Sequence, residues 1–231
     1  MKQLMFEDNT NHITLYNDID PQILEDASQA ASRIEALTFD LALFDCVTDS
    51  LSELKDTCCT KRIHPSILHH KIEQRTRSFL SEFRSFTNHW ETKSKHQGKE
   101  YFSLFREATH HTYDSYEEYG FIYNLRNYAF HIGNVVSRIH GSVELDYIQP
   151  LANKPHLLQT FNKWKAPEKT FIQKQDDFFN LLPIFEKGIH ALETIRDTMM
   201  DAQITPQTIC DCEKLISLYE MLKKLNGSSG S

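Results

Sequence analysis

A long apolar seam near the N-terminus constrains the fold of this chain most strongly. From Ile23 to Leu51, small and apolar side chains recur at alternating steps of four and three residues, with one threonine among them. Such spacing places them on one face of an α-helix for about four heptads, as in a helical bundle. Asp20 and Pro21 stand before the seam as a suitable N-cap and first helical residue. We therefore expect a long helix that starts at Pro21 and ends at residues 58–60.

The same spacing recurs along much of the remaining chain. Pro65 opens a second predicted helix, and residues 93–98 end it. Its seam consists of Ile72, Thr76, Phe79, Phe83, Phe86 and Trp90. A third helical stretch starts near residue 99 and a fourth covers about 115–133, and the sequence leaves open whether these two are continuous. Pro167 starts a long helix that reaches Met199 with a kink at Pro183. The last predicted helix runs from Pro206 to Gly227.

Three segments lack the helical period. Residues 13–16 suit a short strand, and residues 135–148 suit either a β-hairpin or a loop. Residues 154–166 suit an irregular segment or one or two helical turns. The sequence has only seven glycines and seven prolines, which favours long elements over a turn-rich β architecture. The predicted fold is therefore all-α, an antiparallel helical bundle with a small β-hairpin insertion and C-terminal helices.

We treat residues 1–226 as one helical domain, with a bundle core at about 20–140 and a C-terminal helical extension at 150–226. Residues 227–231 have the composition of a flexible linker. No apolar run is long enough for a membrane span, and the N-terminus does not resemble a signal peptide. The five cysteines are odd in number and form no disulfide framework. We therefore expect a cytoplasmic protein that does not enter membranes.

The net charge of −7 is unevenly distributed along the chain. Residues 1–60 contain 12 acidic and 3 basic side chains, whereas residues 61–99 contain 9 basic and 3 acidic ones. The basic segment suits either a solvated helix face or a local phosphate-binding surface. An overall acidic protein is unsuited to coating long nucleic acids, but it can still bind one structured RNA.

Residues 126–131, Arg-Asn-Tyr-Ala-Phe-His, are the best candidates for chemistry. Arginine can bind a phosphate, histidine can move protons near neutral pH, and asparagine can orient either one. Three other Arg-to-His pairs have similar spacing, at 62/69, 84/89 and 106/111. Only the pair at 126 and 131 has Asn directly after Arg and lies within an apolar aromatic run. A structural role for these side chains, as a cap and a core hydrogen-bonding group, is the alternative.

On an α-helix, Asn127 and His131 are i, i+4 neighbours, and Tyr123 and Asn124 lie near the same face one turn earlier. We therefore predict Arg126, Asn127 and His131 as catalytic residues, with Tyr123 and Asn124 as substrate-binding residues. Arg126 lies about 140° around the helix from His131. The two can meet if the arginine wraps around the helix, if the helix ends at His131, or if a second copy supplies the partner. The last arrangement predicts a symmetric homodimer.

The Arg-Asn-x-x-x-His run within a helical domain resembles the HEPN superfamily, whose signature is Arg, four to six residues, then His. The resemblance implies a metal-independent endoribonuclease of a toxin–antitoxin, abortive-infection or other antiviral defence system, which acts as a dimer and needs no cofactor. It places Arg126 on the phosphate, His131 as general acid or base, and Asn127 as the orienting residue. Family members that a partner nucleotidyltransferase silences usually have a tyrosine two residues after the histidine. This chain has Gly133 at that position, so we do not expect silencing by such a partner.

The implied partners are RNA, such as a structured tRNA, a second copy of the chain, and an antitoxin or sensor protein. An alternative from another class is a catalytically inactive HEPN-like bundle that binds a nucleotide or a protein partner. Paired histidines and cysteines, such as His110-His111 and Cys58-Cys59, invite a zinc interpretation. Their spacing matches no common zinc motif, so we predict no metal site.

Overall fold

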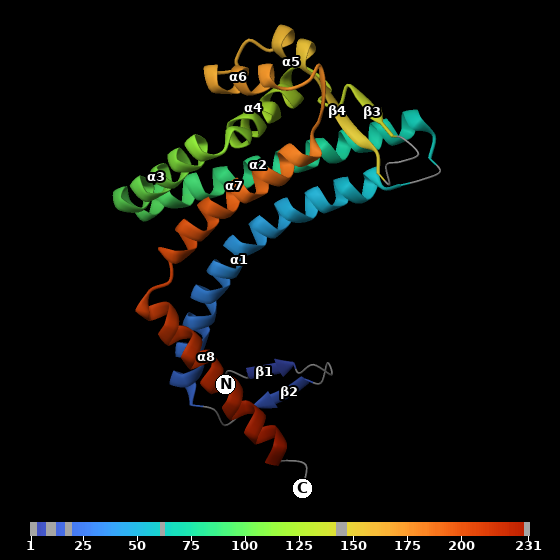
Figure 1. Ribbon diagram of the computed structural model, residues 1–231. Helices are drawn as coiled ribbons and strands as arrows, with labels where there is room; N and C mark the ends of the chain where they lie inside the picture. Colours follow the sequence, from blue (N-terminus) through green and yellow to red (C-terminus); the bar gives the residue numbers. More distant parts are fainter. Residues whose placement is uncertain (1–3, 8–12, 17–19, 61–62, 142–146, 229–231) are drawn as a thin grey trace. The chain divides into compact units, whose positions relative to one another are not determined.

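The structure is a computed structural model that describes residues 4–7, 13–16, 20–60, 63–141 and 147–228. It is predominantly helical, and the described residues form eight α-helices (Figure 1). The chain divides into two compact units. One consists of Met1–Asp40 with Met200–Ser231, and the other is Leu41–Met199. The predicted all-α fold is confirmed. The division, however, does not follow the boundary that we expected between residues 140 and 150.

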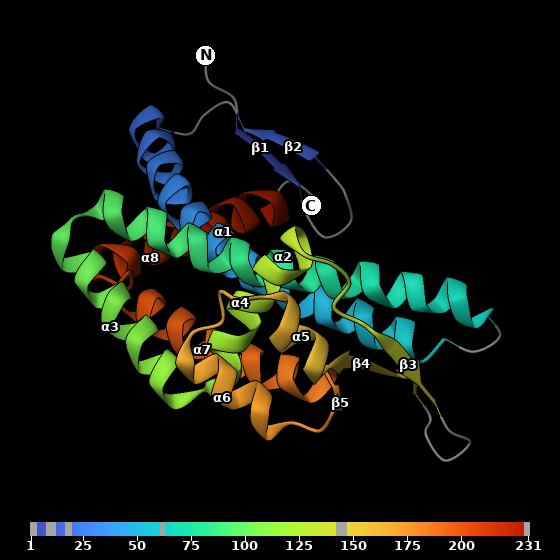
Figure 2. The same ribbon diagram turned by 90° about the horizontal axis from the view of Figure 1, so that it is seen from above.

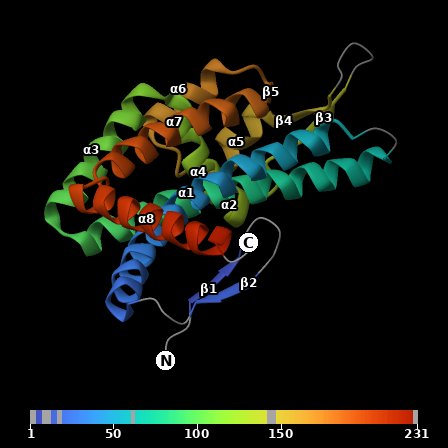
Figure 3. The same ribbon diagram turned by 90° about the horizontal axis from the view of Figure 1, so that it is seen from below.

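The larger unit is an antiparallel bundle with a small sheet. Its main helices are the second part of α1 (Pro21–Cys58), α2 (Pro65–Gln97), α3 (Lys99–Ser115), α4 (Glu117–His131) and the part of α7 (Leu182–Asp201) up to Met199. Viewed from above, α5 (Lys154–Thr160) and α6 (Ala166–Lys174) lie over α4 (Figure 2). Viewed from below, α7 lies beside this part of α1 (Figure 3). An ion pair of 2.6 Å between Lys55 and Glu186 joins the same two helices.

The predicted seam of α2 forms the centre of the bundle. All six of its seam residues, from Ile72 to Trp90, are 0% exposed. The ring of Phe79 packs on Phe185 of α7 with centroids 4.5 Å apart, and Phe83 packs on Tyr119 of α4 at 5.7 Å. Aromatic side chains bury large apolar areas, so this row ties α2 to both neighbouring helices. Within this unit, the buried apolar residues of α1 recur at steps of three and four: Phe44, Val47, Leu51, Leu54 and Cys58. The predicted seam is confirmed only in part, because Val47 is buried in place of Thr48 and Leu41 is 40% exposed.

Two breaks separate α2, α3 and α4. Gly98 has a φ of 115°, a conformation that side chains rarely adopt, and it lies between α2 and α3. Tyr116 is extended, with φ −129° and ψ 100°, between α3 and α4. The third and fourth helical stretches are therefore separate helices.

A three-stranded antiparallel sheet takes one strand from the segment 135–148, which the sequence left open as a hairpin or a loop, and its second strand from just beyond that segment. Strand β3 (Arg138–His140) pairs with β4 (Gln149–Asn153), with Arg138 opposite Leu151. The expected turn at Gly141-Ser142 extends beyond the described residues. The third strand, β5 (Phe178–Asn180), pairs with the other edge of β4. No β-pattern predicted this strand.

The prediction of one kinked helix from Pro167 to Met199 was wrong, because β5 divides it into α6 and α7. Asn180 accepts a hydrogen bond from the Leu182 amide at 3.1 Å and thus satisfies one free donor at the start of α7. Pro183 lies in the first turn of α7, where no intrahelical hydrogen bond needs its missing N–H. The proline therefore begins a helix, and it does not bend one.

The smaller unit contains a two-stranded sheet, the first part of α1 and the whole of the last helix. Strand β1 (Leu4–Glu7) pairs antiparallel with β2 (Ile13–Tyr16), the segment predicted as a strand. The first part of α1 and α8 (Pro206–Ser228) are joined by Arg33, which donates to both carboxylate oxygens of Asp211 at 2.6 and 2.8 Å. This arginine holds the pKa of Asp211 down at about 2, and a hydrogen bond from Gln207 adds to the effect. Among the helices of the described chain, none has the length and apolar character needed to cross a bilayer.

Candidate functional site

Helix α4 carries all five residues that the sequence marks as candidates. Its buried residues include Tyr119, Phe121, Ile122, Leu125, Tyr128 and Ala129. Arg126 and Asn127 are half-buried, and His131 is exposed at the last helical position. Phe130 is 46% exposed and Ile132, the C-cap, is 47% exposed. The helix therefore presents its final turn to solvent while its earlier turns pack in the bundle.

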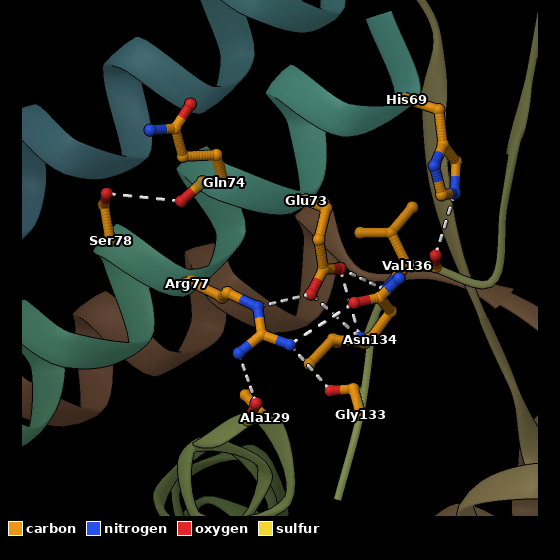
Figure 4. Close-up of polar contacts among 10 residues, drawn as sticks. His69, Glu73, Gln74, Arg77, Ser78, Ala129, Gly133, Asn134 and Val136 are labelled. Atoms are coloured by element: carbon orange, nitrogen blue, oxygen red, sulfur yellow. Dashed lines mark hydrogen bonds and ion pairs between the residues drawn. The ribbon is translucent and has the colours of Figure 1, made fainter. Parts of the chain in front are cut away.

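Arg77 of α2 holds the end of α4 in place (Figure 4). Its guanidinium donates to the carbonyl oxygens of Ala129 and Gly133, the latter at 2.9 Å. The last carbonyls of a helix have no intrahelical donor, so these hydrogen bonds satisfy orphan acceptors. A cation is also favourable at this negative end of the helix dipole. His131 lies between the two anchored carbonyls, so its backbone is fixed from both sides.

Glu73 completes this anchor one turn earlier on α2. Its carboxylate accepts from Arg77 at 2.7 Å and from the backbone amides of Val135 and Val136 at 3.1 and 2.8 Å (Figure 4). Glu73 is 5% exposed. A buried carboxylate is tolerated only when it is paired and hydrogen-bonded, as it is here. Arg77 therefore fixes the chain before the turn that follows α4, and Glu73 fixes it after that turn.

The guanidinium of Arg126 lies over the exposed ring of Phe130, with its Cζ 4.5 Å from the ring centroid. The Cζ of Arg77 lies 5.9 Å from the same centroid. Arg126 has no ion pair with any residue in the described part of the chain, and its buried Nε lacks a hydrogen-bond partner. An arginine without a carboxylate keeps its charge available for a phosphate.

Arg126 and His131 do not meet within one chain. Five positions on a helix separate two side chains by about 140° around the axis and about 7.5 Å along it. No hydrogen bond joins Arg126, Asn127 or His131 to one another among the described residues. Of the three ways in which Arg126 and His131 could meet, as considered from the sequence, one required the helix to end at His131. The helix does end there. The structure thus places the three predicted catalytic residues on the last turns of one helix, without a preformed contact between them.

Tyr123 and Asn124 lie about two turns before His131 on α4, where the helix contacts the bundle. Asn124 is 8% exposed, and its amide donates to Glu168 of α6 at 3.0 Å. The ring of Tyr123 is covered by the guanidinium of Arg84, whose Cζ lies 3.7 Å from the ring centroid. The structure therefore separates these two predicted substrate-binding residues from the exposed turn that carries His131.

No role was assigned from the sequence to three residues near these sites, namely Glu73, Arg77 and Arg84. Glu73 and Arg77 form an i, i+4 pair on α2, a spacing typical of exposed helix pairs, so the pattern did not point to a role at α4. Arg84 was noted only as one of the chance Arg-to-His matches. Its burial lowers the pKa of its guanidinium. Arg84 lies four residues after Leu80 and three before Thr87, both buried, and this spacing is the signal that could have found it.

The residues considered for zinc are dispersed. Within the ranges that the structure describes, no three His, Cys, Asp or Glu side chains are grouped as a metal site requires. His69 contacts the carbonyl oxygen of Val136 at 2.9 Å. All five cysteines are free, and burial raises the pKa of the Cys58 thiol to about 12. A thiol with a raised pKa is a poor nucleophile at neutral pH.

Comparisons with known proteins give no relative for this chain. No family model, no curated protein and no solved structure matches it.

Proposed function

We propose that this chain is a metal-independent endoribonuclease that cleaves RNA by attack of the 2′-hydroxyl on the adjacent phosphate. One observation carries the proposal. An exposed histidine ends α4, and five residues before it lies an arginine that has no carboxylate partner among the described residues. The Arg-Asn-x-x-x-His motif that resembles the HEPN superfamily thus falls on an anchored and accessible helix end. The setting that we propose is toxin or antiviral defence in the cytoplasm, with a structured RNA such as tRNA as substrate.

RNA supplies its own nucleophile, so the protein needs only to move protons and to stabilise charge. A general base removes the proton of the 2′-hydroxyl as its oxygen attacks phosphorus, and the bond to the 5′-oxygen breaks. A general acid then protonates that leaving oxygen. His131 would perform proton transfer, a contribution of about 10²–10⁴-fold in enzymes generally. Arg126 would bind the extra negative charge of the phosphorane. The products are a 2′,3′-cyclic phosphate and a 5′-hydroxyl.

A second copy of the chain would complete the site. Arg126 and His131 lie about 140° apart on α4, so the arginine of one chain would serve the histidine of the other. The exposed Phe130 and Ile132 next to His131 give this helix end apolar surface that a symmetric partner could cover. In that arrangement both Arg–His pairs face one groove, and each pair consists of the arginine of one chain and the histidine of the other.

The test is cleavage of total RNA on a denaturing gel, in EDTA, by wild type and by His131→Ala. We expect cleavage by wild type in EDTA, loss of at least about a hundredfold in His131→Ala, and similar loss in Arg126→Ala. His70→Ala is the matched control, because His70 is also an exposed helical histidine. DNA of the same sequence should resist cleavage because it lacks the 2′-hydroxyl. Cleavage that survives in His131→Ala or that requires Mg²⁺ contradicts the proposal.

The alternative is a catalytically inactive bundle of the same fold that binds a nucleotide or a protein partner, such as an antitoxin or a sensor. It predicts no RNA cleavage and no growth arrest on expression. Growth arrest that Arg126→Ala and His131→Ala both abolish favours the enzyme.

A further inference from the structure

A pocket of about 580 Å³ opens between α2, α3, α4 and the start of α6, away from the last turn of α4. Its volume is within the range of about 300–1,000 Å³ typical of small-molecule sites. His131 and Arg126 are not among its lining residues. Of the residues predicted for the ribonuclease site, only Tyr123 lines the pocket, so the pocket can be tested through residues that are not predicted to act in cleavage.

The pocket carries an excess of positive charge. Arg84, Arg106 and Lys165 line it, and none of the three has a carboxylate partner among the described residues. The two lining acids are Glu91 and Asp114. Glu91 already accepts an ion pair from Lys95 at 2.7 Å, so much of its charge is compensated from outside the pocket. An anion that enters would meet three cations that form no ion pair with any residue in the described part of the chain.

Arg84 is the most unusual of these cations. Its Nη1 is buried without a hydrogen-bond partner. Burial lowers the pKa of its guanidinium, and Tyr119 and the charge of Glu91 offset only part of this effect. A partly desolvated guanidinium with an unsatisfied donor is costly, because a buried charge normally has a partner. A bound anion would supply both the missing charge and a hydrogen-bond acceptor.

Aromatic side chains form much of the remaining wall: Phe102, Phe105, Tyr113, Tyr119 and Tyr123. Cations already lie over three of these rings, and one of them is Lys95, whose Nζ is 5.4 Å from the Phe102 centroid. Arg84 Cζ is 3.7 Å from the Tyr123 centroid, and Lys165 Nζ is 5.4 Å from the Tyr113 centroid. The Tyr113 hydroxyl donates to the buried Glu168, which fixes the ring. Rigid aromatic walls favour a planar ring, since every base has a face that can stack.

We propose that this pocket binds a small aromatic phosphate of the size of a free nucleoside monophosphate. The phosphate is held by Arg84, with Arg106 and Lys165 at the opening, and the planar base lies against the aromatic wall. Arginine suits the first role because its planar fork can donate two hydrogen bonds to phosphate oxygens. A purely apolar ligand would leave the cations without a partner, and an inorganic anion would leave the aromatic wall without a contact. A ligand with both a phosphate and a planar ring therefore fits the pocket best.

The test is isothermal titration calorimetry of the full chain with adenosine 5′-monophosphate, adenosine and inorganic phosphate. We expect the monophosphate to bind at least about tenfold more tightly than either of its parts. Arg84→Gln should weaken binding by about tenfold or more, the loss of one charge-assisted hydrogen bond. Arg75→Gln is the matched control on the same helix, because Arg75 is exposed and pairs with Glu53 at 2.5 Å. It should leave the affinity unchanged.

A second variant protects the test against misfolding of Arg84→Gln. Lys165 is exposed, so Lys165→Gln should keep the fold and still weaken binding by a few fold. His131→Ala should keep full affinity, which separates this site from the ribonuclease proposal. No binding of any of the four common monophosphates overturns the inference. Equal affinity for adenosine and its monophosphate, or binding of a hexadeoxyadenylate strand without binding of the monophosphate, also overturns it.

Discussion

Arg77 connects two parts of the chain that lie more than fifty residues apart. Its guanidinium binds Glu73, Ala129 and Gly133, so Arg77→Met removes hydrogen bonds to both carbonyls at the end of α4. We expect the free energy of unfolding to fall by about 1.5–3 kcal/mol, the contribution of a hydrogen bond to a charged group. Urea unfolding measures this loss. Arg75→Met, which breaks only an exposed pair, should cost less than about 1 kcal/mol. Equal losses in the two variants contradict the anchoring role.

Asp211 makes a pH-dependent contribution to the smaller unit. Arg33 lowers the pKa of its carboxyl to about 2, below the unperturbed value of about 3.9. The ionised form is therefore favoured in the folded chain. Its stabilisation is fully present above about pH 4 and is lost as the pH falls from about 4 toward 2. Asp211→Asn should lower the Tm at pH 7, and the difference from wild type should shrink as the pH falls below 4. A difference that stays constant from pH 7 to pH 3 contradicts this linkage.

At the residue scale, sequence reasoning found side chains whose chemistry is local and missed those whose partners are distant. Arg126 and His131 stand within six residues, so their spacing could be read directly. Arg77 acts through carbonyl oxygens, and every residue type has a carbonyl, so no pattern in the sequence marks its targets. The same holds for Asn124, whose partner Glu168 lies 44 positions away.

Gly188 marks a close approach between α7 and α4. A Cβ added there would lie 2.2 Å from Ile122 Cδ1 and 3.3 Å from Phe83 Cε2. Both neighbours are 0% exposed, so they cannot move aside freely. We expect Gly188→Ala to destabilise the bundle by about 1–3 kcal/mol, measured by urea unfolding. Gly133→Ala is the matched control, because no atom lies within 4 Å of its added Cβ, and it should stay within about 0.5 kcal/mol.

The double variant Gly188→Ala, Ile122→Val sharpens this prediction. Valine lacks the Cδ1 atom that the new methyl group would meet, so much of the lost stability should return. The cost of Ile122→Val alone, about 0.5–1.5 kcal/mol, must be measured in parallel. Losses that simply add, without any recovery, contradict a steric origin at Ile122.

At the element scale, periodicity predicted the helices that bury one continuous face. The α2 row from Ile72 to Trp90 is an example, because each seam residue is fully buried. The interruption between α6 and α7 was missed because Phe178 fits the helical period and also serves as a strand residue in β5. Only pairing with β4 distinguishes the two, and such pairing joins residues about 25 positions apart.

At the scale of the whole molecule, the division into two units was not visible in the sequence. Helix α1 belongs to both units, since it runs from Pro21 to Cys58 across the division at Asp40. A single apolar seam spans that point, so the pattern of α1 alone contains no boundary. The division also brings together chain segments from both ends of the sequence in one unit. The expected core and extension rested on the motif resemblance and on helical periodicity along the chain, and neither can report such pairing.

The assembly of two chains gives the most direct test of how Arg126 and His131 cooperate. If the arginine of one chain serves the histidine of the other, a mixed dimer of Arg126→Ala and His131→Ala keeps one intact pair. Random mixing makes about half of the dimers mixed, so about a quarter of the wild-type cleavage should return. Each variant alone should remain inactive.

Pairing within one chain predicts the opposite result, because each chain of the mixed dimer then lacks one member of its pair. The two variants should therefore be co-expressed with different affinity tags, and the doubly tagged species should be assayed on RNA. A mixed dimer as inactive as its parents contradicts pairing between chains. A wild-type chain that sediments as a monomer while it cleaves RNA contradicts it too. The 140° separation on α4 then requires that Arg126 reach around its own helix, past Phe130, to the phosphate that His131 contacts.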